Sequence, residues 1–494
     1  MCDFLKFNYF LLRLYINFGF RCLIILFFAG CNFDSEEEEM NYNTVELVVE
    51  TNGSGTVTIS NSSYDVGTEI SIAAIPSVGY YFDRWEGFDD IIESQEYTFT
   101  LEKDLNLTAF FIEIPELTDK IEVFNPKKID SNPVFVIENG GNKAYLVSKN
   151  GETLKSWNFD SRLGNDLELL DDGSLIGLFK PENVSFSFGG YGGILKKFDD
   201  NGNLLFEYEL NTIKELLHHD FEVLPNGNIL LMVWESFSVE EAIAMGYDSE
   251  RTIYLEKIIE LNPELQTIVW EWRSSDHLIQ DFNPEASNFG IVSNSPQKID
   301  LNYFEEENGD LMHANGIFYD SANDVIYLSV NFYGEVWVIP HKYDSETTRG
   351  NLGDLIYRFG NPSTYDSTEG TRLFYNNHHP TLVTLDSDTE GRFLIYMNGS
   401  KDEQSEIYEF ILPSFNPDPQ NWVSPEITWT FTDENLFFGK ISGALRLPNG
   451  NTLICEGDYG YWEVTRSKEI VWKYNGGGET TFWRGYVFPN MSIE

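Results

Sequence analysis

The stretch "FEVLPNGNILLMVWE", residues 221–235, has the pattern of one β-hairpin: an apolar strand, a Pro-Asn-Gly turn and a second apolar strand. The same pattern recurs as "LELLDDGSLIGLF" (167–179), "GIFYDSANDVIYLSV" (316–330), "TLVTLDSDTEGRFLIYM" (381–397) and "ALRLPNGNTLICEG" (444–457). A segment that returns at such spacing indicates a repeat architecture. The sequence therefore predicts a fold built from β repeats.

Each hairpin is followed by a second pair of strands, such as "KIIELNPELQTIVWEW" (257–272) and "YWEVTRSKEIVWKY" (461–474). A further copy, residues 132–159, opens the region. Six four-stranded units that cannot each bury both faces predict a six-bladed β-propeller over 132–494. The 38 Phe, 26 Tyr, 11 Trp and 39 Gly favour the same all-β class, with strands joined by tight turns.

Residues 44–113 alternate apolar and polar side chains between turn residues, which predicts a small antiparallel β domain before the propeller. Its order of motifs, G-x-G-x-V, Y-x-x-G-T and P-x-x-G-Y-x-F-x-x-W-x-G, resembles the InlB-type B-repeat of bacterial surface proteins. We expect Phe82 and Trp85 to form the core of so small a domain. Residues 114–131 are interpreted as a linker.

The N-terminus has basic residues at Lys6, Arg13 and Arg21 before the apolar run "CLIILFFAG", and is interpreted as a signal peptide over 1–30. The sequence "FAGC" resembles a bacterial lipobox, which implies lipidation of Cys31. Residues 31–43, with "NFDSEEEE", resemble the acidic tether of Bacteroidetes surface lipoproteins. These resemblances imply the outer membrane or cell surface of a Gram-negative bacterium, with the periplasm as the alternative, and a membrane contact only through the lipid anchor.

The chain carries 80 acidic and 32 basic residues, a formal net charge of −48. Such a charge repels nucleic acid and anionic lipid headgroups, so we expect no nucleic-acid partner. The four cysteines, three of them within the first 31 residues, do not form a disulfide framework. The segment "DSDTEG" (386–391) begins like a calcium loop, but Met397 stands where the bidentate glutamate is required, so it is interpreted as a turn.

Five of the seven histidines stand at the starts of predicted inner strands: His218, His219, His313, His378 and His379. Propellers bind ligands on the axis where inner strands meet, so we expect these side chains to share one channel. The other two, His277 and His341, lie on connections and are expected to be structural or surface residues. The residues leave three chemistries open: a zinc site, which no H-x-H or H-E-x-x-H spacing supports; a serine hydrolase, which lacks a G-x-S-x-G elbow; and a nucleophilic histidine. We expect no metal.

Six blocks resemble, in this order, the bacterial arylsulfate sulfotransferase family: "HHDFEVLPNGNILLMVWE", "KIIELNP…IVWEW…DHLIQDF", "LMHANGIFYD…IYLS", "DLIYRFGNPSTY", "FYNNHHPTLV" and "SGALRLPNGNTLICEG…EIVWKY". The resemblance implies a six-bladed propeller without a cofactor. It also implies transfer of a sulfuryl group from a phenolic sulfate ester to a phenolic acceptor, independently of phosphoadenosine phosphosulfate, through a sulfohistidine. It leaves the oligomeric state open.

The resemblance implies that His378 is the nucleophile and that His219 and His313 are further catalytic histidines. It also implies that Asn315 contacts the sulfuryl oxygens. Two positions depart from the family: Asn331 stands in place of an arginine, and His379-Pro380 follows the nucleophile in place of Asp-Ala. We assign Asn331 and His379 to substrate binding; His379 would restore a cation if it is protonated, and otherwise reflects drift in a site that no longer turns over. The alternative is a catalytically degenerate propeller that acts as a binding or adhesion module.

Overall fold

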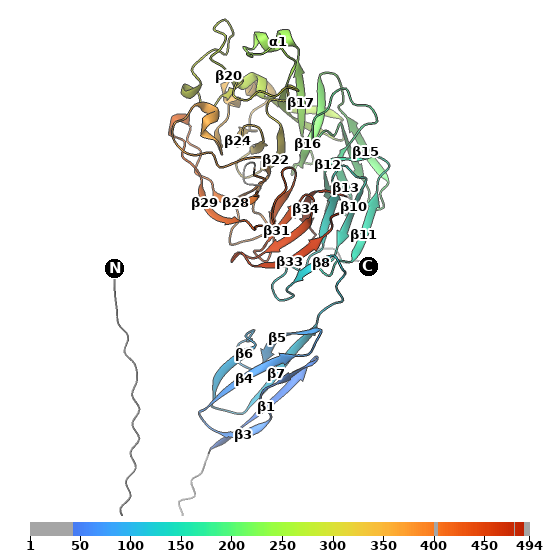
Figure 1. Ribbon diagram of the computed structural model, residues 1–494, viewed down its shortest axis with the longest axis vertical. Coiled ribbons are helices and arrows are strands. Elements are labelled where there is room, and N and C mark those ends of the chain that lie inside the picture. The colour runs from blue at the N-terminus through green and yellow to red at the C-terminus, as the bar shows by residue number, and fades with distance from the viewer. Residues whose placement is uncertain (1–42, 400–403, 479, 489–494) are drawn as a thin grey trace, which may run out of the picture. The chain divides into compact units, whose positions relative to one another are not determined.

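The computed structural model describes residues 43–399, 404–478 and 480–488, and divides into two compact units, a small β domain and a larger one (Figure 1). The predicted signal peptide, Cys31 and nearly all of the acidic tether lie outside these residues. Among the described residues, no helix has the length and apolar character that crossing a membrane requires.

The small domain consists of two sheets, ordered β3-β1-β7-β5 and β2-β4-β6. Their strands are β1 (Thr44–Asn52), β2 (Gly55–Val57), β3 (Ser62–Asp65), β4 (Thr68–Pro76), β5 (Tyr80–Glu86), β6 (Glu96–Leu101) and β7 (Leu105–Glu113). The β1–β3 and β4–β6 pairs are antiparallel, whereas β1 and β7 pair in parallel, a departure from a purely antiparallel domain. Phe82 and Trp85 are 3% and 0% exposed, which confirms that they belong to the core.

Six sheets of four or five strands form the blades of the propeller, as the repeats predict. In order from the axis outward they are blade 1, β34 (Phe482–Val487), β9 (Val134–Glu138), β10 (Lys143–Val147) and β11 (Thr153–Asn158); blade 2, β12 (Leu163–Leu169), β13 (Leu175–Phe179), β14 (Ile194–Phe198) and β15 (Leu204–Glu209); and blade 3, β16 (Glu215–Val223), β17 (Ile229–Phe237), β18 (Ile253–Asn262) and β19 (Thr267–Arg273).

Blades 4 to 6 follow in the same way: blade 4, β22 (Ala314–Asp320), β23 (Val325–Val330), β24 (Glu335–Pro340) and β25 (Tyr357–Phe359); blade 5, β26 (Asn377–Leu382), β27 (Phe393–Met397), β28 (Glu406–Ile411) and β29 (Glu426–Phe431); and blade 6, β30 (Gly443–Arg446), β31 (Thr452–Glu456), β32 (Gly460–Val464), β33 (Ile470–Asn475) and β8 (Ile121–Phe124).

The ring is closed by both ends of the propeller region. Strand β34, near the C-terminus, pairs with β9 and becomes the innermost strand of blade 1, and Figure 1 shows this red strand beside the teal ones. Strand β8 pairs with β33 and adds an outer strand to blade 6. The sequence predicts that residues 114–131 are a linker. The segment also contains β8, so part of it belongs to the propeller. The β34–β9 pair joins the last part of the propeller to its first blade, and β8 ties the segment before blade 1 to blade 6, so both ends of the region are held in the ring.

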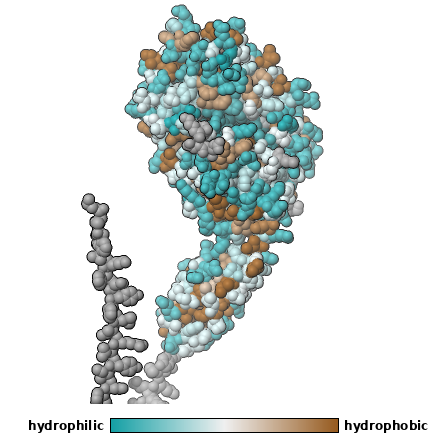
Figure 2. All heavy atoms as spheres, viewed as in Figure 1, coloured by the Kyte–Doolittle hydropathy of each residue, from teal (hydrophilic) through white to brown (hydrophobic). Residues whose placement is uncertain are grey.

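Apolar side chains fill the spaces between blades, because both faces of each blade are covered by its neighbours. Buried tryptophans recur in these layers, among them Trp234, Trp272, Trp337, Trp462, Trp472 and Trp483, all under 2% exposed. On the face seen in Figure 2, hydrophilic residues predominate and apolar ones are scattered. The layers hold the inner strands in fixed register around the axis.

Short elements decorate the connections. They are α1 (Val239–Ala244), α2 (Ser345–Thr348), the 3-10 turns η1 (Ser274–His277), η2 (Val292–Asn294), η3 (Asn351–Gly353), η4 (Pro362–Tyr365) and η5 (Pro419–Asn421), and the two-stranded sheet of β20 (Leu278–Ile279) and β21 (Ile299–Asp300). Helix α1 begins with a capping box, in which Ser238 and Glu241 each bind the other's backbone N–H. The short elements thus lie on the connections, outside the four-stranded sheets of the blades.

Candidate active site

The inner strands are irregular where the histidines lie. The pairing register shifts between Leu217 and Phe221 in β16, and between His378 and Thr381 in β26. His219, His313 and His379 have positive φ angles of 52°, 49° and 55°. Bulges and left-handed residues turn side chains away from the regular alternation of a strand and cluster at functional sites. The strands therefore depart from regular geometry where the predicted site residues stand.

The structure brings the predicted histidines together. The rings of His219 and His313 are 4.8 Å apart between centroids and nearly perpendicular. A charge on His378 lowers the pKa of His219, and a charge on His313 lowers the pKa of His378, after burial in each case. Residues from blades 3, 4 and 5 thus share one electrostatic environment.

These three histidines are held in the same way, each through Nδ1. In His219 the anchor is Nδ1 of His218 (2.9 Å), in His313 a carboxylate oxygen of Asp310 (2.5 Å), and in His378 the amide oxygen of Asn398 (2.6 Å). Within the described residues, Nε2 of none of the three makes a hydrogen bond. Anchoring at Nδ1 fixes a ring and leaves its other nitrogen for a ligand.

The tautomer of His378 follows from its partner. The amide nitrogen of Asn398 donates to the carbonyl oxygens of Phe438 (2.6 Å) and Ile441 (2.9 Å), so the amide oxygen must face His378. Nδ1 of His378 therefore carries the proton and donates it to Asn398, and Nε2 holds a lone pair. Burial lowers the pKa of His378 to about 3, which keeps the imidazole neutral. A neutral ring with a free Nε2 is the form that acts as a nucleophile.

His379 has the opposite tautomer. Its Nδ1 accepts a hydrogen bond from the backbone N–H of Ala444 (3.2 Å), so its proton stands on Nε2. Burial, and next the positive charge of Arg484, lower its pKa well below the usual value. Both observations disfavour a protonated His379 in place of the missing cation. Its Nε2–H can donate a hydrogen bond to a ligand but cannot attack one.

His313 has the character of a cation. Burial alone would lower its pKa, but the carboxylate of Asp310 outweighs burial and raises the pKa above the usual value. The His313 ring stacks on Phe332, with 4.7 Å between centroids and 16° between planes. A raised pKa and an aromatic surface therefore meet at one side chain.

The predicted amides lie in the same region. Asn315 is fully buried and its side-chain nitrogen donates to the carbonyl oxygen of Asn377 (2.8 Å), which ties β22 to β26. One of its two amide hydrogens is thus engaged with the protein. Asn331 follows β23, is 6% exposed, and its backbone N–H donates to the carbonyl oxygen of His313 (3.3 Å). Asn331, which the resemblance places at an arginine position of the family, is therefore adjacent to His313.

A glycine of the β13–β14 connection covers His219. Gly190 has a φ of +83°, and a side chain there would place its Cβ 1.9 Å from Nε2 of His219. The carbonyl oxygen of Gly190 accepts hydrogen bonds from the His219 backbone N–H (2.8 Å) and from the side chain of Asn165 (2.6 Å). Only glycine permits this approach of the loop to the ring.

Sequence reasoning missed a buried cation. Arg484 of β34 is 2% exposed, donates to Asp220 (2.9 Å) and to the carbonyl oxygen of Asn315 (3.3 Å), and lies 3.6 Å from Asp166. Its charge lowers the pKa values of His219, His378 and His379 further, after burial. It comes from the strand that closes the ring, and no motif around "FWRGYV" marks it. Asp310 and Asn398 were also missed, because no motif marks them either.

The remaining histidines are tied to carboxylates elsewhere in the fold. His277 contacts Asp354 at 2.8 Å, and His341 contacts Glu260 (3.0 Å) and Asp324 (2.8 Å). The described residues contain no group of three or more His, Cys, Asp or Glu side chains that could hold a metal ion.

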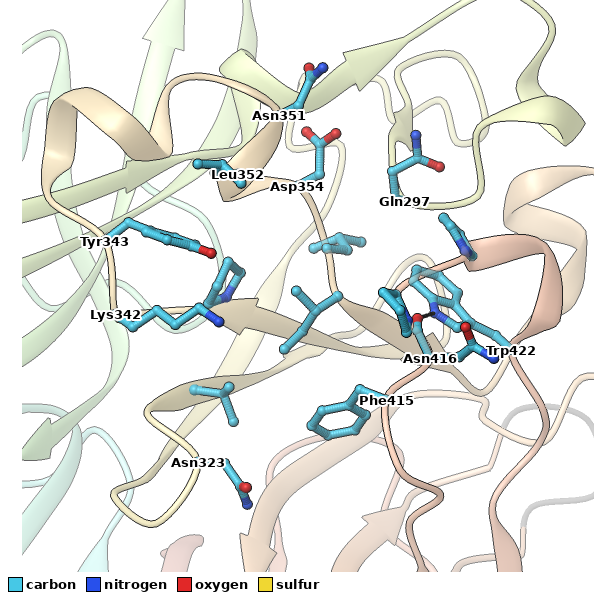
Figure 3. A pocket seen from close by; sticks show the side chains of 16 residues that line it. Gln297, Asn323, Lys342, Tyr343, Asn351, Leu352, Asp354, Phe415, Asn416 and Trp422 are labelled. Carbon is cyan, nitrogen blue, oxygen red and sulfur yellow. Dashed lines mark hydrogen bonds between the residues drawn. The ribbon is translucent and has the colours of Figure 1, made fainter.

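A cavity of about 560 Å³ lies away from the candidate-site histidines, between blades 4 and 5 (Figure 3). Tyr343, Asp354, Phe415 and Trp422 are among its lining side chains, and no histidine of the described chain lines it. Because none of the residues predicted from the sequence lines it, we assign it no part in the chemistry.

The model of the arylsulfotransferase (ASST) family matches residues 114–409, more than half of the chain. This protein belongs to the arylsulfotransferase family. A second model, that of the divergent InlB B-repeat domain, matches residues 45–115. The arylsulfotransferase match contains every predicted site residue of the propeller, whereas Arg484 lies beyond its end. None of the curated proteins matches this chain.

Several solved structures are similar to this protein. A protein of unknown function from Bacteroides caccae is 11% identical, with a TM-score of 0.43, over 73% of this chain and 100% of its own. The β-propeller domain of Cps50 (Swd1) from Myceliophteria thermophila is 10% identical, with a TM-score of 0.35, over 73% and 89%. A putative 6-phosphogluconolactonase from Bacteroides fragilis is 12% identical, with a TM-score of 0.37, over 74% and 100%.

Proposed function

We propose that the protein transfers a sulfuryl group from a phenolic sulfate ester to a phenolic acceptor through a sulfohistidine at Nε2 of His378. The observation that carries this proposal is the hydrogen bond from Nδ1 of His378 to Asn398, because it leaves the lone pair on Nε2 of a neutral ring. The family match supports the reaction class.

In the first half-reaction, the Nε2 lone pair of His378 attacks sulfur and the bond between sulfur and the aryl oxygen breaks. The bonding electrons leave with that oxygen, and a proton from the site neutralises the phenolate. In the second half-reaction, the oxygen of an acceptor phenol attacks sulfur, the N–S bond breaks, and the phenol's proton passes to the site. Each half-reaction thus moves one sulfuryl group and one proton.

The other two histidines fit supporting roles. A protonated His313 donates from Nε2–H to the sulfuryl oxygens, where it supplies charge in place of the arginine that Asn331 replaces. His219, 4.8 Å from His313 between ring centroids, serves as the acid and base for the phenolic oxygen. Asn315 and the Nε2–H of His379 are the further donors that we assign to substrate binding.

The test is transfer itself, measured as release of nitrophenol from nitrophenyl sulfate that depends on an added phenol. Wild type and His379→Ala should turn over, whereas His378→Ala should not. If wild type shows no transfer across a panel of phenolic sulfates, the protein is better explained as a degenerate binding propeller. The changes at Asn331 and His379 would then account for the loss of activity.

We also propose that the mature protein is a lipoprotein anchored through Cys31 at the cell surface. The supports are the lipobox-like "FAGC" and the acidic tether, which the structure does not describe. Growth with a labelled fatty acid should label wild type and not Cys31→Ser, and protease added to intact cells should remove the protein. Mature wild-type protein that begins at another residue would contradict the proposal.

A further inference from the structure

Three buried ionisable groups stand in a row behind the candidate site. Oε2 of Glu256, in β18, lies 3.0 Å from Nε2 of His218, and Nδ1 of His218 lies 2.9 Å from Nδ1 of His219. Glu256 is 2% exposed, His218 0% and His219 3%. The row thus leads from a buried carboxyl group to Nε2 of His219, the nitrogen of the row that remains for a ligand.

The row is held by packing on one side and by a backbone bond at its end. His218 stacks flat on Trp234, with 4.0 Å between ring centroids and 6° between planes. Oε1 of Glu256 accepts a hydrogen bond from the backbone N–H of Ala314 (2.8 Å), so Oε2 is the oxygen that faces His218. The contact between Oε2 and Nε2 is not an aligned hydrogen bond in this structure. Catalytic contacts commonly tighten only when substrate binds.

We propose that Glu256 stores the proton that His219 gives to the leaving phenolate and takes it back from the acceptor phenol, with His218 passing it between them. This inference rests on the proposed function. In it, His219 is a catalytic residue, and Glu256 and His218 are positioning and relay residues that act through it.

The outward step moves one proton from the row to the leaving phenolate. At the start the protons stand on Oε2 of Glu256, on Nδ1 of His218 and on Nε2 of His219. The Nε2 proton of His219 moves to the leaving phenolate oxygen, the Nδ1 proton of His218 moves to Nδ1 of His219, and the Glu256 proton moves to Nε2 of His218. One proton has left the site and Glu256 is a carboxylate.

The return step is the reverse. When an acceptor phenol attacks the sulfohistidine, its proton moves to Nε2 of His219, the proton on Nδ1 of His219 returns to Nδ1 of His218, and the proton on Nε2 of His218 returns to Glu256. A complete cycle therefore exchanges no proton with solvent, which suits groups that are almost fully buried.

The surroundings support a protonated Glu256 at the start. Burial, and next the negative charge of Asp310, raise the pKa of Glu256 well above its usual value. Burial lowers the pKa of His218 to about 3, so His218 passes protons without holding a charge. The other titratable groups that act on the row are Asp220, His313, His378 and Arg484.

The experiment compares two donors that differ in how much their leaving group needs a proton. Phenyl sulfate releases a basic phenolate and depends on the acid, whereas nitrophenyl sulfate releases a weakly basic one. In single turnovers, Glu256→Gln and His218→Phe, which keeps a ring against Trp234, should slow sulfation of His378 by phenyl sulfate about 100-fold or more. Sulfation by nitrophenyl sulfate should change little.

The matched control is Glu456→Gln. Glu456 is likewise buried and binds a backbone N–H, that of Phe437 (3.2 Å), and an indole N–H, that of Trp462 (2.9 Å), but it contacts no histidine among the described residues. This variant should slow neither donor. It reports what the loss of a buried carboxyl group does without a relay.

Three results would overturn the relay. One is an equal loss with both donors, which would indicate a purely structural role. Another is an unchanged rate with phenyl sulfate. The third is a Glu256→Gln/His218→Phe double variant that loses the product of the two single losses, because members of one relay are not additive. Absence of any adduct in wild type would instead refute the proposed function.

Discussion

Replacing Asn398 tests the basis of the nucleophile assignment. The Asn398→Ala variant removes the acceptor that lies 2.6 Å from Nδ1 of His378, so the ring is free to rotate and to place its proton on Nε2. A buried hydrogen bond lost in this way costs about 1–3 kcal/mol, which corresponds to roughly a 5- to 150-fold slower sulfation of His378. The assay is the rate of sulfuryl adduct formation with nitrophenyl sulfate, followed by intact mass.

The variant also leaves the carbonyl oxygens of Phe438 and Ile441 without their donor, so stability will fall as well. Asn451→Ala is the control, because Asn451 is a buried asparagine of blade 6 whose amide nitrogen binds Glu463 (2.7 Å) and the carbonyl oxygen of Lys128 (2.6 Å). It should lower the unfolding temperature without slowing the adduct. Sulfation of Asn398→Ala at the wild-type rate would refute the tautomer argument.

Three further predictions follow from the charges. Because burial lowers the pKa of His378 to about 3, the rate of sulfation should not fall as the pH is lowered from about 7 to about 5, where a histidine of ordinary pKa would be only about 3% neutral. Transfer should instead decline at alkaline pH, as His313, whose pKa is raised, loses its proton. Asn331→Arg should raise the transfer rate about thirtyfold, because a charged donor aimed at the sulfuryl oxygens is worth about 2 kcal/mol in the transition state, and an unchanged rate would show that His313 already suffices. Burial would raise the pKa of Glu409, but three arginines outweigh it and lower the pKa to about 2. The stabilisation from this lowered pKa is complete above about pH 4.5 and is lost as pH falls toward 2. Glu409→Gln should therefore lower the free energy of unfolding at neutral pH by about 3 kcal/mol. Denaturant titration would measure this loss, which should vanish in acid.

The architecture was predictable because each blade repeats a local signal. The hairpins at 167–179 and 444–457 fold where the alternation and the turn residues place them, as β12–β13 and β30–β31. Ring closure was not predictable in the same way, because β34 and β8 each make their sheet pairs with strands hundreds of residues away. A strand that completes a distant blade carries no local turn or hairpin pattern of its own.

In the candidate site, too, the features with a local sequence signal were predictable and those set by long-range packing were not. The clustering of His219 and His313 follows from their equivalent places at the starts of inner strands, which the sequence shows. The difference between His378 and His379 depends on which hydrogen-bond partner meets each Nδ1, and those partners, Asn398 and Ala444, are set by packing across blades. The cation of Arg484 is likewise hidden in the sequence, because its strand reaches the axis only through ring closure.

The central claim is that Nε2 of His378 carries the sulfuryl group, and trapping that adduct tests it most directly. Wild-type protein would be incubated with nitrophenyl sulfate without an acceptor, quenched at alkaline pH, weighed intact and mapped by peptide fragmentation. The account predicts a mass increase of one sulfuryl group, located on His378, that disappears when a phenol is added before the quench. An adduct on His379 or another residue, or turnover without any adduct, would contradict it.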